Sequence, residues 1–284
     1  MGDHSHHHPD EPGSADAMAE MLDLDAEVLH AYLSDAIAWV RDLAADRPRH
    51  RILDLGSGTG TATIALARAF PRAEVLAIDS STELLARTTT KIRDLGMTEQ
   101  VGTLQADLDG PWPHVDPADV VWASMSLHHL ADPDRVLAEV FTDTRPGGLF
   151  AIAEMDATPR LLPDDIGIGA PGLEARCHAA LAETHARQLP HLGSDWGQRL
   201  PRAGFGPVAR RTFTIDLDPP LPPPAGPYAQ AWLRHMRTQL DGAIAADDQA
   251  TLDTLIDSDG PHSVLRRHDL VVRSTRTIWA GTRP

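Results

Sequence analysis

The spacing of hydrophobic residues changes repeatedly between positions 49 and 156. Short apolar runs, which are typical of buried strands, alternate with segments in which apolar residues recur every three or four positions, as on one face of a helix. The predicted strands are 52–55, 74–79, 101–107, 119–125 and 148–154, and the predicted helices are 61–70, 81–95 and 134–144. Strands separated by helices of this length indicate βαβ units, and therefore a doubly wound α/β domain with a mostly parallel sheet.

The pattern changes on either side of this core. The predicted divisions are a disordered His-rich tail at 1–17, lid helices at 18–48, the α/β core at 49–156, a helical cap at 157–200, and a C-terminal part at 201–284. Within the C-terminal part, 208–217 and 270–281 read as strands, with a helical insertion at about 226–260. These two strands are expected to extend the sheet.

The first predicted strand leads into the sequence ILDLGSGTG, which runs from Ile52 to Gly60. Ligands of a parallel sheet bind beyond the carboxyl ends of its strands, which is where Gly56, Gly58 and Gly60 lie. Glycine accepts a positive φ and has no Cβ, so a ligand can lie against the backbone. The spacing differs from the G-x-G-x-x-G of dinucleotide sites, and the G-K-[ST] of a phosphate loop is missing. An ordinary tight turn is the alternative interpretation.

Acidic residues end the next two strands. Asp79 is placed to accept hydrogen bonds from both hydroxyls of a ribose, and it would repel a 2′-phosphate, which disfavours NADP. Asp107 could accept a hydrogen bond from the exocyclic amine of an adenine. Either carboxylate alone could simply be solvated. Three consecutive strands that each end in a suitable group favour a ligand that contains a nucleoside.

The amino-acid composition of the chain argues against several classes of binding partner. The chain has 284 residues with 41 acids against 25 bases, a net charge of −16, whereas a nucleic-acid binder shows a basic surface. Nucleic acids and anionic membranes are therefore not expected as partners. With Cys177 as the single cysteine, no internal disulfide can form, and no apolar run approaches the ~18 residues of a membrane span, so we expect a cytoplasmic location. The tract at 4–8 could bind a transition metal loosely or have no role, and we predict no metal site.

Five stretches, in this order and spacing, resemble the class I S-adenosylmethionine-dependent methyltransferases: ILDLGSGTG, VLAIDSS, LQADLD, VVWASMSLHHLADP and RPGGLFAIAEMD. The closest group is the small-molecule branch that is similar to the ubiquinone/menaquinone methylases. The resemblance is specific over about residues 50–156. It implies a Rossmann-like methyltransferase fold, whose seven-stranded sheet has an antiparallel last strand. It also implies S-adenosylmethionine as the cofactor and S-adenosylhomocysteine as its product.

The resemblance assigns the cofactor to the carboxyl ends of the first four core strands. The methionine portion would be bound by Asp54 and by the backbone of Gly56, Ser57, Gly58 and Gly60. Asp79 would bind the ribose, and the adenine would be surrounded by Ser80, Asp107 and Leu108. The methionine and sulfonium side would be lined by Ser124 and Met125.

Methyl transfer requires the acceptor to be aligned with the methyl group and water to be excluded. A base helps when the acceptor has a proton to lose. His128 and His129 follow the fourth strand, and Glu154 ends the fifth, so all three are candidate catalytic residues, with His129 favoured as the base. The histidines could instead serve packing, and Glu154 could only orient the substrate.

The expected function is methyl transfer to O, N or C of a small organic molecule. Basic residues of the predicted cap would suit an anionic acceptor, although they could equally form a solvated helix face: Arg176, His178, His185 and Arg187. Two alternatives stay open at this point. The acceptor could be a peptide or protein carboxylate, or the chain could be a non-catalytic S-adenosylmethionine-binding protein.

Overall fold

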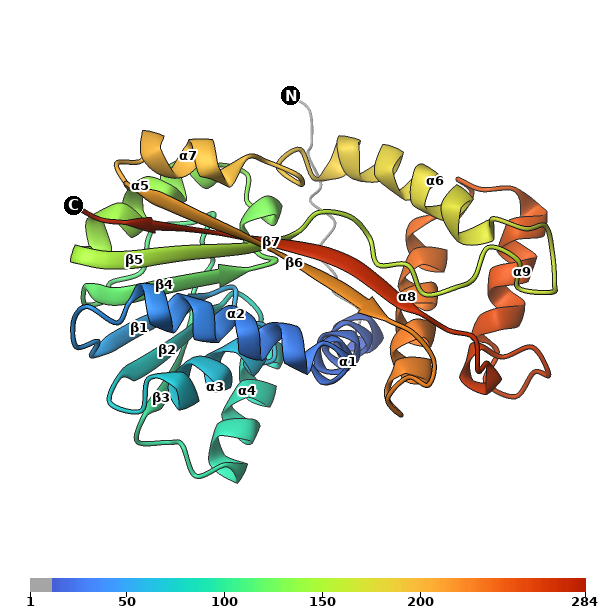
Figure 1. The fold of residues 1–284 in the computed structure, drawn as a ribbon, viewed down its shortest axis with the longest axis horizontal. Helices are drawn as coiled ribbons and strands as arrows, with labels where there is room; N and C mark the ends of the chain where they lie inside the picture. The colour runs from blue at the N-terminus through green and yellow to red at the C-terminus, as the bar shows by residue number, and fades with distance from the viewer. Residues whose placement is uncertain (1–11) are drawn as a thin grey trace.

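Seven strands form one sheet in the computed structural model, which describes residues 12–284 (Figure 1). In chain order they are β1 (Arg51–Leu55), β2 (Glu74–Asp79), β3 (Val101–Gln105), β4 (Ala118–Ser124), β5 (Thr144–Met155), β6 (Val208–Leu217) and β7 (Val272–Thr282). Their order across the sheet is β3-β2-β1-β4-β5-β7-β6, and of these strands β7 runs antiparallel to its neighbours. The predicted doubly wound α/β fold, with one reversed strand near its end, is confirmed.

The helices occupy both faces of the sheet and the far end of the molecule (Figure 1). They are α1 (Pro12–Val28), α2 (His30–Leu43), α3 (Thr61–Ala69), α4 (Thr82–Asp94), α5 (Pro133–Asp143), α6 (Leu173–Gln188), α7 (Trp196–Arg202), α8 (Ala225–Gln239) and α9 (Ala246–Ile256), with short 3₁₀ turns η1 (Leu127–His129) and η2 (Val264–Arg266). Ser81 caps α4, because its Oγ accepts a hydrogen bond from Leu84 N at 3.2 Å.

The central strands bury side chains on both faces, which explains their continuous apolar runs. Ile52 and Trp122 pack on one face in a cluster with α2 and α3. Leu53 and Val121, one position away along the same strands, pack on the other face in a cluster with α5 and α7. The alternation of neighbouring residues between the two clusters fixes the register of the sheet.

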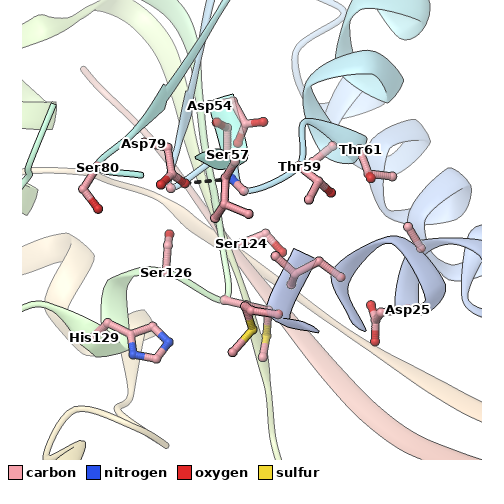
Figure 2. A pocket seen from close by; sticks show the side chains of 18 of the residues that line it. Asp25, Asp54, Ser57, Thr59, Thr61, Asp79, Ser80, Ser124, Ser126 and His129 are labelled. Carbon is pink, nitrogen blue, oxygen red and sulfur yellow. Dashed lines mark hydrogen bonds between the residues drawn. The ribbon is translucent and has the colours of Figure 1, made fainter. Parts of the chain in front are cut away.

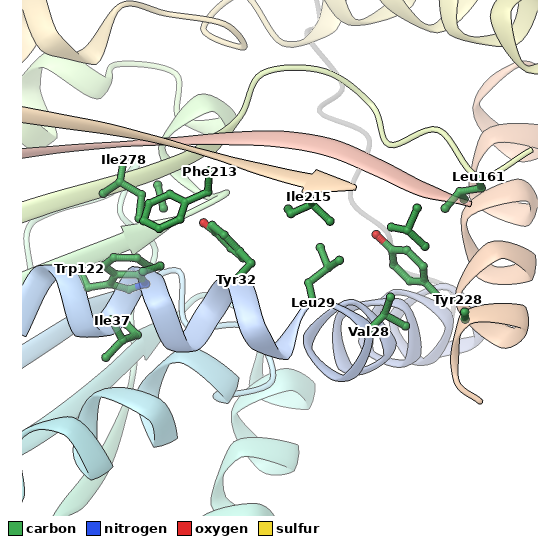
Figure 3. Packing of buried hydrophobic residues seen from close by; sticks show 14 of the residues in the cluster. Val28, Leu29, Tyr32, Ile37, Trp122, Leu161, Phe213, Ile215, Tyr228 and Ile278 are labelled. Atoms are coloured by element: carbon green, nitrogen blue, oxygen red, sulfur yellow. The ribbon is translucent and has the colours of Figure 1, made fainter. Parts of the chain in front are cut away.

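The strands β6 and β7 extend beyond the parallel part of the sheet towards α8 and α9 (Figure 1). Phe213 and Ile215 on β6 face Tyr32 and Leu29 of the N-terminal helices (Figure 3). The rings of Tyr32 and Phe213 meet edge to face, with their centroids 5.5 Å apart. At the far end of the same cluster, Tyr228 brings α8 against α1. The beginning and the end of the chain therefore share one hydrophobic core.

Some element boundaries differ from the prediction. The His-rich tract lies outside the described residues, but α1 begins at Pro12, inside the segment predicted to be disordered up to 17. This helix packs against α4 and α8, and such packing stabilises a helix whose own apolar pattern is weak. The lid pattern is interrupted at Leu29, between α1 and α2. The helix α7 was not predicted, because it is short and contains Pro201.

Candidate functional site

A cavity of about 470 Å³ lies beyond the carboxyl ends of β1, β2, β3 and β4 (Figure 2). This size is within the usual range for small-molecule sites. The helices α1 and α2 contribute Asp25 and Tyr32 to its wall, and Leu29 contributes from the junction between them. The predicted cofactor residues that line it are Asp54, Gly56, Ser57, Gly58, Asp79, Ser80, Asp107, Leu108, Ser124 and Met125. Gly60 closes the same loop without being part of the lining.

Two glycines determine the shape of the loop after β1. Gly56 has φ +67° and Gly60 has φ +76°, in the left-handed region where a Cβ is strained. A Cβ at Gly56 would lie 2.3 Å from the Cβ of Ser126, and one at Gly60 would lie 2.5 Å from Cγ2 of Thr88. The close approach expected at these glycines is therefore already made by the protein's own residues, from the loop after β4 and from α4.

Asp79, at the end of β2, is held in one orientation by backbone donors. Its Oδ2 accepts a hydrogen bond from Gly58 N at 2.8 Å (Figure 2). Its Oδ1 accepts one from Ser81 N at 2.9 Å. A carboxylate oxygen can accept more than one hydrogen bond, so both oxygens keep acceptor capacity toward the cavity. This geometry suits a pair of vicinal hydroxyls.

Asp54 lies almost fully buried under the glycine loop. Burial raises the pKa of its carboxyl group to about 7, and the negative charge of Asp79 contributes to the rise. The hydrogen bond that Thr63 Oγ1 donates to Oδ2, at 2.5 Å, lowers the pKa but does not offset the effect of burial. A cation bound nearby would favour the ionised form of Asp54.

The charges of the cavity wall suit a cation better than a phosphate. One arginine, Arg276, stands among the lining residues against five acids: Asp25, Asp54, Asp79, Asp107 and Asp109. The buried Oγ of Ser57 has no hydrogen-bond partner among residues 12–284. S-adenosylmethionine carries a sulfonium and an ammonium group, so these residues fit it, whereas the pyrophosphate of a dinucleotide would be repelled.

The loop after β4 is held in a strained conformation. Met125 is a non-glycine residue with φ 56°, and its N donates a hydrogen bond to Ala153 O at 2.9 Å. Ser126 Oγ donates to Leu55 O, also at 2.9 Å. Such strain persists only where neighbouring structure enforces it, and it is concentrated at functional sites. The two hydrogen bonds tie this loop to β5 and β1, and they keep Ser124 and Met125 at the cavity wall.

The two candidate histidines have different positions. His129 lines the cavity (Figure 2), whereas His128 is buried behind it, with the ring centroids 4.1 Å apart. His128 Nδ1 is 2.6 Å from Oε2 of Glu154, which is also buried. The pKa of His129 is lowered to about 4. Burial is the largest cause, and the charges of His128 and His185 add smaller contributions in the same direction. Because more than a third of the His129 surface is exposed, solvent screening moderates this effect.

A polar cluster that sequence reasoning missed lies between the lid helices and β7. Arg276 Nη2 donates a hydrogen bond to Asp25 Oδ1 at 2.6 Å, and Tyr228 OH donates to the same oxygen at 2.9 Å. Tyr32 lies beside them, with the Arg276 guanidinium carbon 5.1 Å from its ring centroid. The available signal was that Arg276 and Ile278 are two positions apart in a predicted strand and therefore share a face of the sheet, where a buried charge needs a partner.

The basic residues of the cap do not line this cavity. Arg176 on α6 forms a two-point ion pair with Asp248, at 2.8 Å and 2.7 Å, and Arg187 is exposed. His178 and His185 are half-buried on the same helix, outside the lining. The positive charge in the cavity wall comes from Arg276 instead, so the anionic-acceptor argument based on the cap is not supported by its geometry.

Residues 12–284 lack two kinds of feature. No helix in this part of the chain is long and apolar enough to cross a membrane. The same residues contain no group of three or more His, Cys, Asp or Glu side chains that could hold a metal ion.

The family described as a methyltransferase domain matches residues 52–148. A trans-aconitate 2-methyltransferase of Azoarcus sp. is 35% identical over 181 residues, which cover 58% of this chain and 69% of that protein. A ubiquinone/menaquinone biosynthesis C-methyltransferase of Vibrio vulnificus is 32% identical over 115 residues, 40% of this chain and 44% of that protein. The chain thus spans less than half the length of several curated relatives that it matches.

A solved structure has the same fold. The structure of a putative methyltransferase from Bacillus halodurans superimposes with a TM-score of 0.55 at 18% identity, and the match covers 87% of this chain and 98% of that one. The Azoarcus relative is matched over more than two thirds of its length. The chain therefore belongs to the class I S-adenosylmethionine-dependent methyltransferases.

Proposed function

We propose that this protein transfers a methyl group from S-adenosylmethionine to O, N or C of a small organic acceptor. The observation that supports this most strongly is a single cavity that joins the glycine loop and Asp79 to His129 and Arg276. The relatives in the comparison are named for methyl transfer to small molecules, which supports the same acceptor class. No observation favours a protein carboxylate or a non-catalytic role.

The cofactor supplies an activated methyl group when it is bound. In our proposal Asp79 holds the ribose hydroxyls with the two oxygens that the backbone already orients. Asp54, whose ionised form a nearby cation would favour, balances the ammonium group of the methionine portion. The adenine is assigned to Ser80, Asp107 and Leu108, and the sulfonium side to Ser124 and Met125, all of which lie in the cavity wall.

The remaining residues would align the acceptor and exclude water. The lid helices α1 and α2 cover the cavity, and Leu29 contributes an apolar wall. For an acceptor that loses a proton, His129 is the residue placed to accept it, because its ring faces the cavity. The pKa of His129 is lowered, so the ring is neutral at pH 7 and can accept a hydrogen bond. His128, fixed by Glu154, supports the His129 ring from behind and acts as a positioning residue.

The test begins with binding. Isothermal titration calorimetry should show that the protein binds S-adenosylhomocysteine and does not bind NAD. A turnover assay that detects S-adenosylhomocysteine release, with a panel of small carboxylates, phenols and amines, should then identify an acceptor. An Asp79→Ala variant is the control for cofactor-dependent signal. Absence of S-adenosylhomocysteine binding would refute the proposal. Binding without turnover of any panel member would favour the non-catalytic alternative.

With Cys177 buried and no disulfide available, we infer a cytoplasmic location.

A further inference from the structure

The lid helix α1 lies directly against the loop that follows β1. Met18, Leu22 and Asp25 of this helix line the cavity. A Cβ at Gly58 would lie 3.3 Å from Cδ1 of Leu22, so the apolar side chain of Leu22 rests on the loop itself. A ligand of this cavity therefore meets α1, and the position of the helix affects how the ligand enters and leaves.

The C-terminal end of α1 is firmly attached. Asp25 Oδ1 accepts hydrogen bonds from Arg276 Nη2 at 2.6 Å and from Tyr228 OH at 2.9 Å. Arg276 and Tyr228 are buried on β7 and α8, so this end of the helix is anchored in the shared hydrophobic core. The part of α1 before Asp25 depends on other contacts to stay over the cavity.

Two ion pairs join that part of α1 to α4. Lys91 Nζ lies 2.5 Å from Asp23 Oδ1, and only 31% of the Lys91 side chain and 30% of the Asp23 side chain are exposed. Arg87 Nη2 lies 2.7 Å from Asp16 Oδ1, but 77% of the Asp16 side chain is exposed. Water and salt screen the exposed pair more strongly, so the pair of Lys91 and Asp23 contributes more to holding α1 in place.

Lys91 also holds the loop beneath α1. Its Nζ donates a hydrogen bond to Thr59 O at 2.9 Å, and Thr88 on the same helix donates from Oγ1 to Gly58 O at 3.0 Å. Lys91 is the single lysine of a chain that otherwise uses arginine. An ammonium group is compact and has three donors, so it can bond to a carboxylate and to a carbonyl at the same time. Lys91 therefore connects α1 to the loop.

We propose that the ion pair of Lys91 and Asp23 is a latch that holds α1 closed over the cofactor, so that breaking the pair admits and releases S-adenosylmethionine and S-adenosylhomocysteine. This inference rests on the proposed function. Lys91 does not line the cofactor cavity and acts through α1 and the loop, which makes it a positioning residue. A latch that opens equally readily with and without ligand changes the rates of entry and release by the same factor, and leaves affinity unchanged.

The test uses Asp23→Asn, which removes the charge on the lid and keeps the bond between Lys91 and Thr59. Arg87→Met is the matched control, because it breaks the exposed ion pair between the same two helices. Release of radiolabelled S-adenosylhomocysteine into an excess of unlabelled ligand gives the dissociation rate. Calorimetry gives the affinity, and the two values together give the association rate. Thermal unfolding confirms that the variants are folded.

Asp23→Asn should raise both rates about fivefold and change affinity by less than about twofold, whereas Arg87→Met should exchange the ligand as the wild type does. Raising the salt from about 0.1 M to about 1 M shortens the screening length from about 10 Å to about 3 Å, so it should speed exchange in the wild type more than in Asp23→Asn. Adding Asp23→Asn to Lys91→Met should not speed exchange further, because both changes break the same pair.

Wild-type rates in Asp23→Asn would overturn the latch and leave the proposed function intact. Faster release with an unchanged association rate would also overturn it, because Asp23 would then only support the bound ligand. The latch fails as well if Arg87→Met speeds exchange as much as Asp23→Asn, since a general loosening of α1 would explain both. A wild-type protein that binds no S-adenosylhomocysteine would refute the proposed function itself, and the latch with it.

Discussion

Adding one methyl group at Gly56 tests whether the shape of the glycine loop controls both stability and cofactor binding. Gly56→Ala places a Cβ 2.3 Å from the Cβ of Ser126, at a backbone φ of +67°. Ser126 cannot move away freely, because its Oγ is bonded to Leu55 O at 2.9 Å. The loop must therefore shift, and with it the Gly58 N that orients Asp79.

A second glycine separates the two contributions to the cost. Gly96 has the same φ of +67°, but a Cβ there would meet no heavy atom within 4 Å. Gly96→Ala should therefore show the backbone strain alone, about 1–2 kcal/mol. Gly56→Ala adds the steric overlap, which for overpacking is about 1–3 kcal/mol. We expect a total loss of about 2–5 kcal/mol in the free energy of unfolding for Gly56→Ala.

The assay is urea unfolding followed by tryptophan fluorescence, with calorimetric titration of S-adenosylhomocysteine on each folded variant. Gly56→Ala should weaken binding about tenfold or more, whereas Gly96→Ala should bind normally. Ser126→Gly in the Gly56→Ala background removes the opposing Cβ. A double-mutant cycle should therefore recover the steric part of the loss, about 1–3 kcal/mol.

The reasoning would be refuted by equal stability and equal affinity in Gly56→Ala and Gly96→Ala. It would also be refuted if the cycle between positions 56 and 126 gave no coupling, since the two Cβ atoms would then not compete for space.

Three further predictions concern ionisable groups of the site. Asp79→Ala should lower affinity for S-adenosylhomocysteine about tenfold or more by calorimetry, while Glu74→Ala at the exposed start of the same strand should not. His129→Ala should lower kcat about 10²-fold for an acceptor that loses a proton and leave cofactor affinity within twofold, and an unchanged kcat would exclude His129 as the base. The pKa of His129 is lowered in the fold to about 4, below its unfolded value of ~6.5. Its unfolded form therefore binds more protons between these pH values, and wild-type stability should fall relative to His129→Gln as pH drops from 6.5 to 4, by about 1 kcal/mol after solvent screening. The exposed His262→Gln variant should follow the wild type over the same pH range.

Much of the sheet could be predicted because its signals are local. The strands at Glu74–Asp79 and Val208–Leu217 have the bounds that the sequence indicated, since apolar runs between helices mark them directly. Ser81 was recognisable as a helix cap from its place before an amphipathic segment. The meeting of Asp79 and Asp107 in one cavity also followed, because parallel strands end at the same edge of a sheet.

The opposite wall of the cavity could not be predicted in this way. Arg276 meets Asp25 across 251 positions of the chain, and Tyr228 meets Asp25 across 203. Arg176 likewise finds Asp248, which removes it from the role that its sequence context indicated. Hydrophobic periodicity determines which residues of a strand or helix are buried. Which buried side chains then face one another depends on how the N-terminal helices, the cap and the last strand pack together, and that packing is the sum of many weak contacts that no short stretch of sequence contains.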